Sequence, residues 1–422
     1  MPLANRTILV PVLFLAASVI IGCGTAPPRA MSEQVFAERL AGHEEKSLAQ
    51  RDEIAERLLR RLEYRHAEQA ELGRAEEPFT YEVLMLSSGG QFGAFGVGVL
   101  QGWSEVEDPT FQRPEFDLVT GVSTGALIAP FSLLGTDDSI RRIDQLYREA
   151  SDRLATLRGL LFFLPRQPSF FDNQPLADRI ASELDLATVR GIADAHAEHR
   201  KLLLGSTDLD LGRFRIWDLG PKAVHALETE DLSHIHRILL SSAAIPAAFP
   251  PVDIDGVLYA DGAVAQGAFV GLDRDEIVQV FREFRERNPG AAMPKLRFWI
   301  IVNGFLDVDP ELIKASWVPG ARRSIEVLTS YAMRVTLRHM QFGVELLGRD
   351  LDTQADFFYL AVPHGLELPP QTERLFDPQV METLAAEGRR LGQDPLSWRT
   401  EALAPEIPGS ALDLERAPRE TR

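Results

Sequence analysis

The stretch VTGVSTGALIAP, residues 119–130, places a serine two residues from a glycine on each side. An apolar, strand-like run precedes Ser123, and a helix-compatible run follows it. Because the strand must end and the helix begin within about two residues, Ser123 is expected to project from the carboxyl edge of a sheet, with Gly121 and Gly125 giving room for the turn. The pattern favours a nucleophile. The alternative is a serine that only caps the helix.

A serine nucleophile needs hydrogen-bond donors that stabilise the oxyanion of its tetrahedral intermediate. The stretch SSGGQFGAFGVGVL reads as the end of a strand, a pair of glycines and a helix that opens near Gly93. Backbone amides at a helix N-terminus suit a developing negative charge. The sequence therefore predicts an oxyanion hole at Gly89, Gly90 and Gln91. A nucleotide-phosphate loop is a weaker alternative, since neither G-x-G-x-x-G after the strand nor G-K-[ST] occurs, and glycines that only allow close helix packing are another.

The serine also needs a base that takes its proton. GVLYADGA is a short hydrophobic strand that ends in Asp261 and Gly262, although an Asp-Gly pair is by itself most often a turn. His364, in YLAVPHG, competes for the role. The chain order Ser123, Asp261, His364 is the order of an α/β-hydrolase triad.

Together these motifs resemble those of the patatin-like phospholipases, over roughly residues 79–395. That family carries G-G-G-x-[RK]-G, then G-x-S-x-G, then D-G-[GA], and the chain has SGGQFG, GVSTG and DGA at residues 88–93, 121–125 and 261–263. The resemblance implies an α/β protein with a three-layer α/β/α fold and a mostly parallel central sheet. It further implies a Ser123–Asp261 dyad, an acyl-enzyme intermediate, and no metal or other cofactor.

Two residues depart from the family's first motif. Ser88 replaces a glycine and Phe92 replaces the basic residue. Neither change removes the backbone amides of the expected oxyanion hole. Phe92 does remove a cation that could hold a negatively charged head group, which weakens the expectation of a specifically anionic substrate.

Apolar runs that alternate with helix-like stretches predict a parallel sheet covered on both faces. Before the first strand, residues 31–77 form a charged segment in which Ile54, Leu58 and Leu62 recur every four residues. This narrow stripe predicts a helical arm packed on the main domain, with a protein-partner site as the alternative. Arg61 and Arg65 are expected on the surface of that helix.

The N-terminus reads as a membrane-targeting segment. Arg6 precedes the apolar run 8–22, which is shorter than the about 20 residues of a spanning helix. Cys23, the sole cysteine, follows it in a context that resembles a bacterial lipobox. A lipidated Cys23 would anchor the protein in the cell envelope, and Gly24 favours the outer membrane. The net charge of −18 argues against a nucleic-acid partner.

The expected organisation is a signal peptide (1–22), a tether and arm (23–78), an acyl hydrolase domain (79–395) and a flexible tail (396–422). We expect a membrane-anchored serine hydrolase of phospholipid or lysophospholipid acyl esters. The alternatives are an inactive scaffold that binds a protein partner and an esterase or thioesterase with the His364 triad. Residues 159–176, rich in phenylalanine and leucine, suit either an acyl-chain lid or the core.

Overall fold

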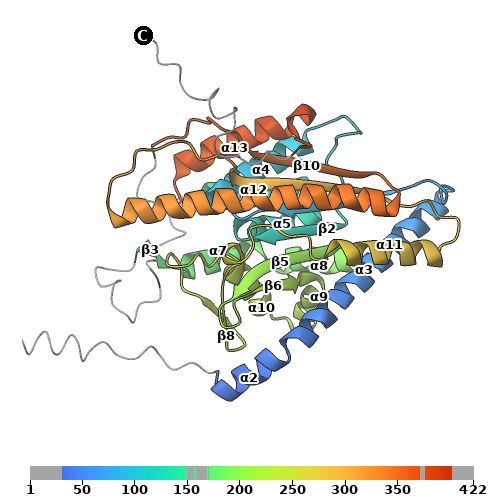
Figure 1. Ribbon diagram of the computed structural model, residues 1–422, viewed down its shortest axis with the longest axis horizontal. Coiled ribbons are helices and arrows are strands. Elements are labelled where there is room, and N and C mark those ends of the chain that lie inside the picture. The colour runs from blue at the N-terminus through green and yellow to red at the C-terminus, as the bar shows by residue number, and fades with distance from the viewer. Residues whose placement is uncertain (1–30, 150–155, 158–168, 170, 371–375, 402–422) are drawn as a thin grey trace, which may run out of the picture.

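The computed structural model describes residues 31–149, 156–157, 169, 171–370 and 376–401 (Figure 1). The strands are β1 Thr80–Leu86, β2 Leu118–Val122, β3 Thr156–Leu157, β4 Phe171–Asp172, β5 Lys201–Asp208, β6 Arg213–Asp218, β7 Val252–Ile254, β8 Val257–Asp261, β9 Lys295–Phe305 and β10 Ala355–Val362. The helices are α2 Glu33–Ala41, α3 His43–Glu71, α4 Gly93–Ser104, α5 Thr124–Leu134, α6 Asp137–Glu149, α7 Gln174–Glu183, α8 Leu186–Ala197, α9 Leu219–Thr229, α10 Ser233–Ser242, α11 Arg274–Arg287, α12 Trp317–Leu351 and α13 Pro378–Gly392, with short 3-10 turns at η1 Gly90–Phe92, η3 Gly262–Val264 and η4 Pro395–Ser397.

The main sheet has the order β10-β9-β1-β2-β5-β8-β7, and β6 also pairs with β5. The strands from β10 to β5 are parallel, whereas β6, β7 and β8 add antiparallel pairs at one edge. Five of the apolar runs seen in the sequence form the parallel part. The expected α/β fold with a mostly parallel sheet is confirmed, and the edge strands β6 and β7 are additions to it.

The two faces of the sheet carry separate hydrophobic cores. Along β1, Leu84 and Leu86 belong to the core covered by α4, α5 and α13, while Val83 and Met85 belong to the core that includes α3, α11 and α12. This alternation follows from the two-residue repeat of a strand. Figure 1 shows α12 lying across the sheet and α13 beside α4. The expected three layers are thus present.

The arm consists of α2 and α3, and α3 packs beside α11 (Figure 1). Its stripe of Ile54, Leu58, Leu59 and Leu62 is buried in the core with β1 and β9. The prediction that the stripe packs on the chain's own domain is confirmed. A protein partner of the arm would therefore have to use other surfaces of α2 and α3.

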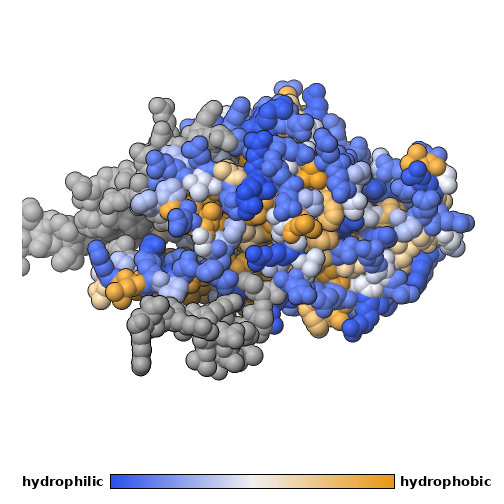
Figure 2. All heavy atoms as spheres, turned by 90° about the horizontal axis from the view of Figure 1, so that it is seen from above, coloured by the Kyte–Doolittle hydropathy of each residue, from blue (hydrophilic) through white to orange (hydrophobic). Residues whose placement is uncertain are grey.

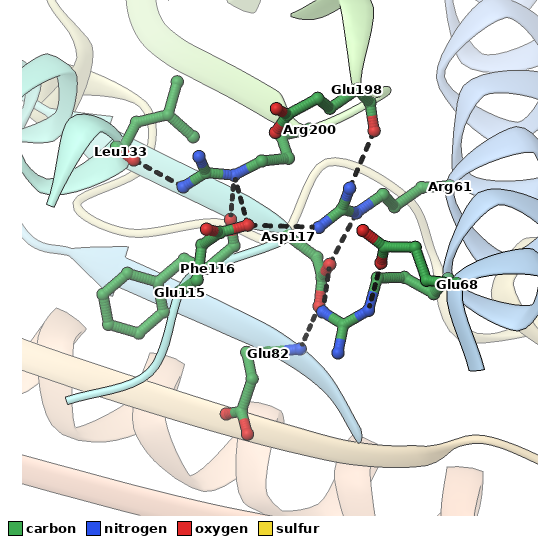
Figure 3. A network of polar contacts seen from close by, with 10 residues as sticks. Arg61, Glu68, Glu82, Glu115, Phe116, Asp117, Leu133, Glu198 and Arg200 are labelled. Atoms are coloured by element: carbon green, nitrogen blue, oxygen red, sulfur yellow. Dashed lines mark hydrogen bonds and ion pairs between the residues drawn. The ribbon is translucent and has the colours of Figure 1, made fainter. Parts of the chain in front are cut away.

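Arg61 lies in the interior, which corrects the expectation that it faces solvent. Its Nε donates to Asp117 Oδ1 at 2.7 Å and its Nη1 donates to Glu198 O at 2.8 Å (Figure 3). The Arg61 side chain is 2% exposed and that of Asp117 0%. Asp117 Oδ2 also accepts from the backbone N–H of Glu82 at 2.8 Å. Simple helix periodicity placed Arg61 outside because it does not reveal a buried carboxylate on another element.

The packed domain also extends beyond its expected end. Trp398 is buried, with ring centroids 4.7 Å from Trp103 and 4.8 Å from Trp299. The backbone N–H of Tyr359 donates to Arg399 O at 2.9 Å. Residues 398–399 therefore belong to the core and the sheet, although the sequence placed them in a tail from residue 396.

The outer surface is largely hydrophilic, with separate hydrophobic patches on the face seen in Figure 2. In the described part of the chain, no helix has both the length and the apolar character needed to cross a bilayer. The expected apolar leader at residues 8–22 and Cys23 lie outside the described residues.

Candidate active site

Two consecutive residues of β5 bring the predicted nucleophile and base together. Gly205 pairs with Val122 at the end of β2, and Ser206 pairs with Asp261 at the end of β8. Because Ser123 follows Val122 directly, its side chain emerges beside Asp261. Ser123 Oγ donates to Asp261 Oδ2 at 2.5 Å, and both residues are 3% exposed. A hydroxyl and a carboxylate 138 positions apart thus form one buried pair.

The backbone of Ser123 has the strained geometry of a strand-to-helix corner. Its φ of 56° and ψ of −123° are unusual for a residue with a Cβ and occur mainly where the surroundings impose them. A Cβ on Gly121 would lie 2.4 Å from Gly125 O, and one on Gly125 would lie 2.2 Å from Leu86 O. Both glycines of the motif are therefore required by close backbone approach, as the sequence predicted.

Ser242 holds this corner in place and was missed in the sequence. Its Oγ accepts from the Ser123 N–H at 2.9 Å and donates to Gly205 O at 2.5 Å. It thus links the nucleophile's backbone to the strand that pairs with both β2 and β8. The signal was present in SSAAIPAAFPP, but a serine at the end of a helix has many possible roles, and only the fold shows what it faces.

Asp261 has the electrostatics of a base that works near neutral pH. Burial raises its pKa to about 7, and hydrogen bonds from the Ser123 hydroxyl and the Ala263 N–H oppose part of that rise. The Ala263 N–H donates to Oδ1 at 2.8 Å and leaves Oδ2 for Ser123. Gly262 lies where a Cβ would come within 2.6 Å of Gly205 O, so the Asp-Gly pair allows β8 to approach β5.

The expected oxyanion loop lies next to this pair. Gly89 precedes the 3-10 turn η1, in which Gly90 has a φ of +56° and lines the same cavity as Ser123. Within the described residues, the amides of Gly89, Gly90 and Gln91 donate to no acceptor. At the start of α5, the amides of Thr124 and Gly125 also have no acceptor within the described part of the chain, whereas the amide of Ala126 donates to Ser123 O. The structure therefore gathers free donors beside the serine.

Side chains around the loop fix its position. Gln91 Oε1 accepts from the Asp377 N–H at 3.0 Å, which ties the loop to the start of α13. Gly93 opens α4 and has no room for a Cβ, which would lie 2.0 Å from Thr124 Oγ1. Phe92, at the family's basic position, packs edge-on against Phe305 with centroids 5.6 Å apart. This site therefore has an aromatic contact where the family motif has a cation.

A small apolar cavity of about 20 Å³ adjoins Ser123. It is lined by Gly90, Ser123, Thr124, Leu127, Tyr147, Leu176, Ala243, Ile245, Phe249, Phe376 and Met381. A space of this size holds about one water-sized group, so an acyl chain requires some of these side chains to move apart. Leu176 is the described end of the segment 159–176. The rest of the predicted lid or core segment, residues 158–168 and 170, lies outside the described part of the chain.

His364 does not join the pair. It is 62% exposed and its Nδ1 lies 3.4 Å from Asp309 Oδ1. It follows β10, at the opposite side of the sheet from β8, five strand positions or about 24 Å away. The geometry does not support the triad. Among the described residues, no three or more His, Cys, Asp or Glu side chains are grouped to hold a metal.

Residues 84–272 match the family model described as patatin-like phospholipase. No curated protein sequence matches the chain. Among solved structures, the crystal structure of VipD from Legionella pneumophila is similar with a TM-score of 0.33 and 15% identity, covering 73% of this chain and 67% of that one. The matched segment holds the oxyanion loop, the nucleophile motif and Asp261. Residues 84–272 are therefore similar to the patatin-like phospholipases over the segment that holds this site.

Proposed function

We propose that this protein is a membrane-anchored serine hydrolase that cleaves fatty acyl esters of phospholipids or lysophospholipids. The observation that carries the proposal is the hydrogen bond of 2.5 Å from Ser123 Oγ to Asp261 Oδ2, buried beside the free amides of Gly89 and Gly90. A strained nucleophile, a base with a raised pKa and unpaired donors meet at one cavity. Those are the components that acyl transfer requires.

In the proposed reaction, Asp261 takes the hydroxyl proton as Ser123 Oγ attacks the ester carbonyl carbon. The negative charge that develops on the carbonyl oxygen is stabilised by the amides at Gly89, Gly90 and Gln91. The intermediate collapses to a Ser123 acyl ester, and Asp261 returns its proton to the leaving alcohol. Water then adds to the acyl ester as Asp261 takes its proton. Asp261 returns that proton to Ser123 Oγ as the bond from Oγ to the acyl carbon breaks, and the fatty acid leaves.

The apolar cavity wall supports an acyl rather than a polar group on that side of the serine. Leu127, Leu176, Phe249 and Met381 present carbon atoms to the space in which the acyl chain would begin. Burial of each methylene there contributes about 0.8 kcal/mol. Substrates with longer saturated acyl chains should therefore bind more tightly, until the chain is too long for the cavity to accommodate.

Lipid attachment at Cys23 would place this cavity at a bilayer, in the outer membrane by our proposal. The support is the apolar run 8–22 that ends at the chain's sole cysteine. Metabolic labelling with an alkyne fatty acid tests it. Wild-type protein should carry the label and sediment with the outer membrane, whereas Cys23→Ala should be unlabelled. Equal labelling of both proteins would contradict the proposal.

A fluorophosphonate probe tests the nucleophile, since it reacts with activated serines. Wild-type protein should be labelled and Ser123→Ala should not. Ser132→Ala is a matched control, because Ser132 is also buried but its Oγ only donates to Ile128 O within α5. Absence of labelling in folded wild-type protein would favour a catalytically inactive scaffold that binds a partner.

A further inference from the structure

A second and larger cavity lies between the arm and the antiparallel edge of the sheet. It has a volume of about 670 Å³ and runs between α3, strand β6, the β7–β8 turn and α12. None of its lining residues lines the cavity beside Ser123. We call this space, bounded by Lys46, Gln50, Arg213, Arg215, Lys222 and Trp217, the basic groove.

Four cations of the basic groove have no carboxylate partner. In the described part of the chain, Lys46, Arg213, Arg215 and Lys222 make no ion pair, although each lines the groove. Other lining cations are neutralised, as when Arg39 pairs with Asp208 and Arg51 with Asp273. Arg215 and Lys222 are half-buried, whereas Lys46 and Arg213 are exposed.

Two of these cations are held against one indole. The Arg215 guanidinium carbon lies 5.0 Å from the ring centroid of Trp217, and Lys222 Nζ lies 5.5 Å from it. Arg215 Nη1 donates to Gln50 Oε1 of the arm at 3.1 Å, which fixes the guanidinium further. Its Nε is buried and has no hydrogen-bond partner among the described residues. A ligand in the groove would therefore bind this guanidinium through its Nη atoms.

The electrostatics of the groove favour an anion. Burial, together with the nearby Arg215 charge, lowers the pKa of Lys222, and Asp218 and Asp255 oppose that shift only in part. Asp255 is the lining carboxylate that, within the described residues, has no ion pair. One carboxylate does not balance four cations, so a bound anion would relieve their mutual repulsion.

We propose that the basic groove binds a phosphate-bearing ligand. Guanidinium and ammonium groups together bind phosphate oxygens through charge-assisted hydrogen bonds, and arginine adds two parallel donors. The apolar part of the lining, which includes Phe269, Leu272 and Met340, leaves space for a non-polar portion of the same ligand. This function is additional to ester hydrolysis and does not depend on Ser123.

Calorimetric titration of the full chain in the Ser123→Ala background tests the proposal, because that background prevents turnover of acyl ligands. Inorganic pyrophosphate is the first titrant. Saturable binding is expected, with Kd raised at least about tenfold in Arg213→Gln/Lys222→Gln, since removal of a charge-assisted hydrogen bond typically weakens binding by about tenfold or more. Binding should also weaken as salt increases. Thermal unfolding of each variant verifies that the fold is retained.

The matched control is Arg190→Gln/Arg285→Gln, which removes the same charge from two exposed arginines outside the groove. Its Kd should be unchanged. Equal increases in Kd for both double variants, or no saturable binding of any phosphate-bearing titrant by the folded protein, would overturn the proposal.

Two further titrants identify the source of the phosphate. Hexanoyl glycerol phosphate that binds more tightly than pyrophosphate indicates a lipid head group, and the reverse order indicates a soluble phosphate compound. Hexanoyl glycerol has the same acyl chain without the phosphate. Binding of hexanoyl glycerol as tight as that of its phosphate ester would contradict a phosphate site.

Discussion

Arg61 on the arm helix α3 and Asp117, which directly precedes β2, form an ion pair inside the protein, with 2.7 Å between Nε and Oδ1. Arg65 Nη1 reaches the same carboxylate oxygen at 3.2 Å. The strand that Asp117 precedes ends at Val122, directly before the nucleophile. The arm therefore supports the strand that positions Ser123, in addition to covering one face of the sheet.

Replacement of Arg61 should strongly destabilise the protein. Arg61→Met leaves Asp117 buried with only part of its compensation, so we expect a decrease of about 3–5 kcal/mol in the free energy of unfolding. Urea unfolding followed by circular dichroism measures it. Arg60→Met is the control, because Arg60 is 55% exposed and pairs with Glu56 on the surface. If Arg61→Met lowers the free energy of unfolding by less than about 1 kcal/mol, the Arg61–Asp117 pair is not important for stability.

Ser242 should affect turnover through the position of Ser123. Ser242→Ala removes the acceptor of the Ser123 N–H, and we expect kcat to fall by about tenfold or more with little change in KM. Ser241→Ala is a matched control, since Ser241 is equally buried but its Oγ donates only to Ile238 O. If the two variants have the same kcat, Ser242 has no positioning role.

The pH dependence of kcat/KM should report Asp261. Only the carboxylate accepts the Ser123 proton, and burial raises the pKa of Asp261 to about 7. Activity should therefore rise with pH through a midpoint near 7 and be about a hundredfold lower two pH units below it. Initial rates of ester hydrolysis, measured in buffers of constant ionic strength, give the dependence of kcat/KM on pH. A midpoint near 4 would mean that the base is not buried as described.

The same burial predicts that the charged form of Asp261 lowers the free energy of unfolding. Its pKa is raised from an ordinary 3.8 to about 7 in the folded state, so the folded state binds the proton more tightly. The contribution of protonated Asp261 to the free energy of unfolding is fully present below about pH 4 and is lost as the pH rises through about 7. Asp261→Asn keeps the acceptor for the Ala263 N–H and removes the charge. It should raise the free energy of unfolding at pH 8 by about 1–2 kcal/mol.

That gain should accompany a fall in activity of about 10²–10⁴-fold, because the general base is removed. Thermal unfolding and turnover of one preparation give both values. A variant that is less stable than wild type at pH 8 would contradict a charged, desolvated Asp261.

The motifs were enough to predict the main elements of the fold and the pair at its centre. Gly121 and Gly125 flank Ser123, and Gly262 follows Asp261. At each of these positions a Cβ would meet a neighbouring backbone, and glycines at such spacing can be recognised in the sequence. Apolar runs of five or more residues likewise predicted the parallel strands. The charged stretch RFRIWD of β6 was not recognised, because an exposed edge strand lacks a continuous apolar pattern.

Contacts between distant elements were not predictable in the same way. Chain order made His364 a possible triad member, but strand order places β10 far from β8. Helix periodicity placed Arg61 outside, although Asp117 holds it inside. The SSAAIPAAFPP stretch contains Ser242, but a serine at a helix end has many possible roles, and its contact with the Ser123 N–H appears only in the fold. Each of these depends on which elements become neighbours, and a single sequence does not specify that.

The most direct measurement is mass spectrometry of the products that purified protein releases from mixed phospholipids and lysophospholipids. Wild-type protein should release free fatty acids together with the matching deacylated lipids, while folded Ser123→Ala and Asp261→Asn release essentially none. Fatty acid release by Ser123→Ala at the wild-type rate would contradict the account.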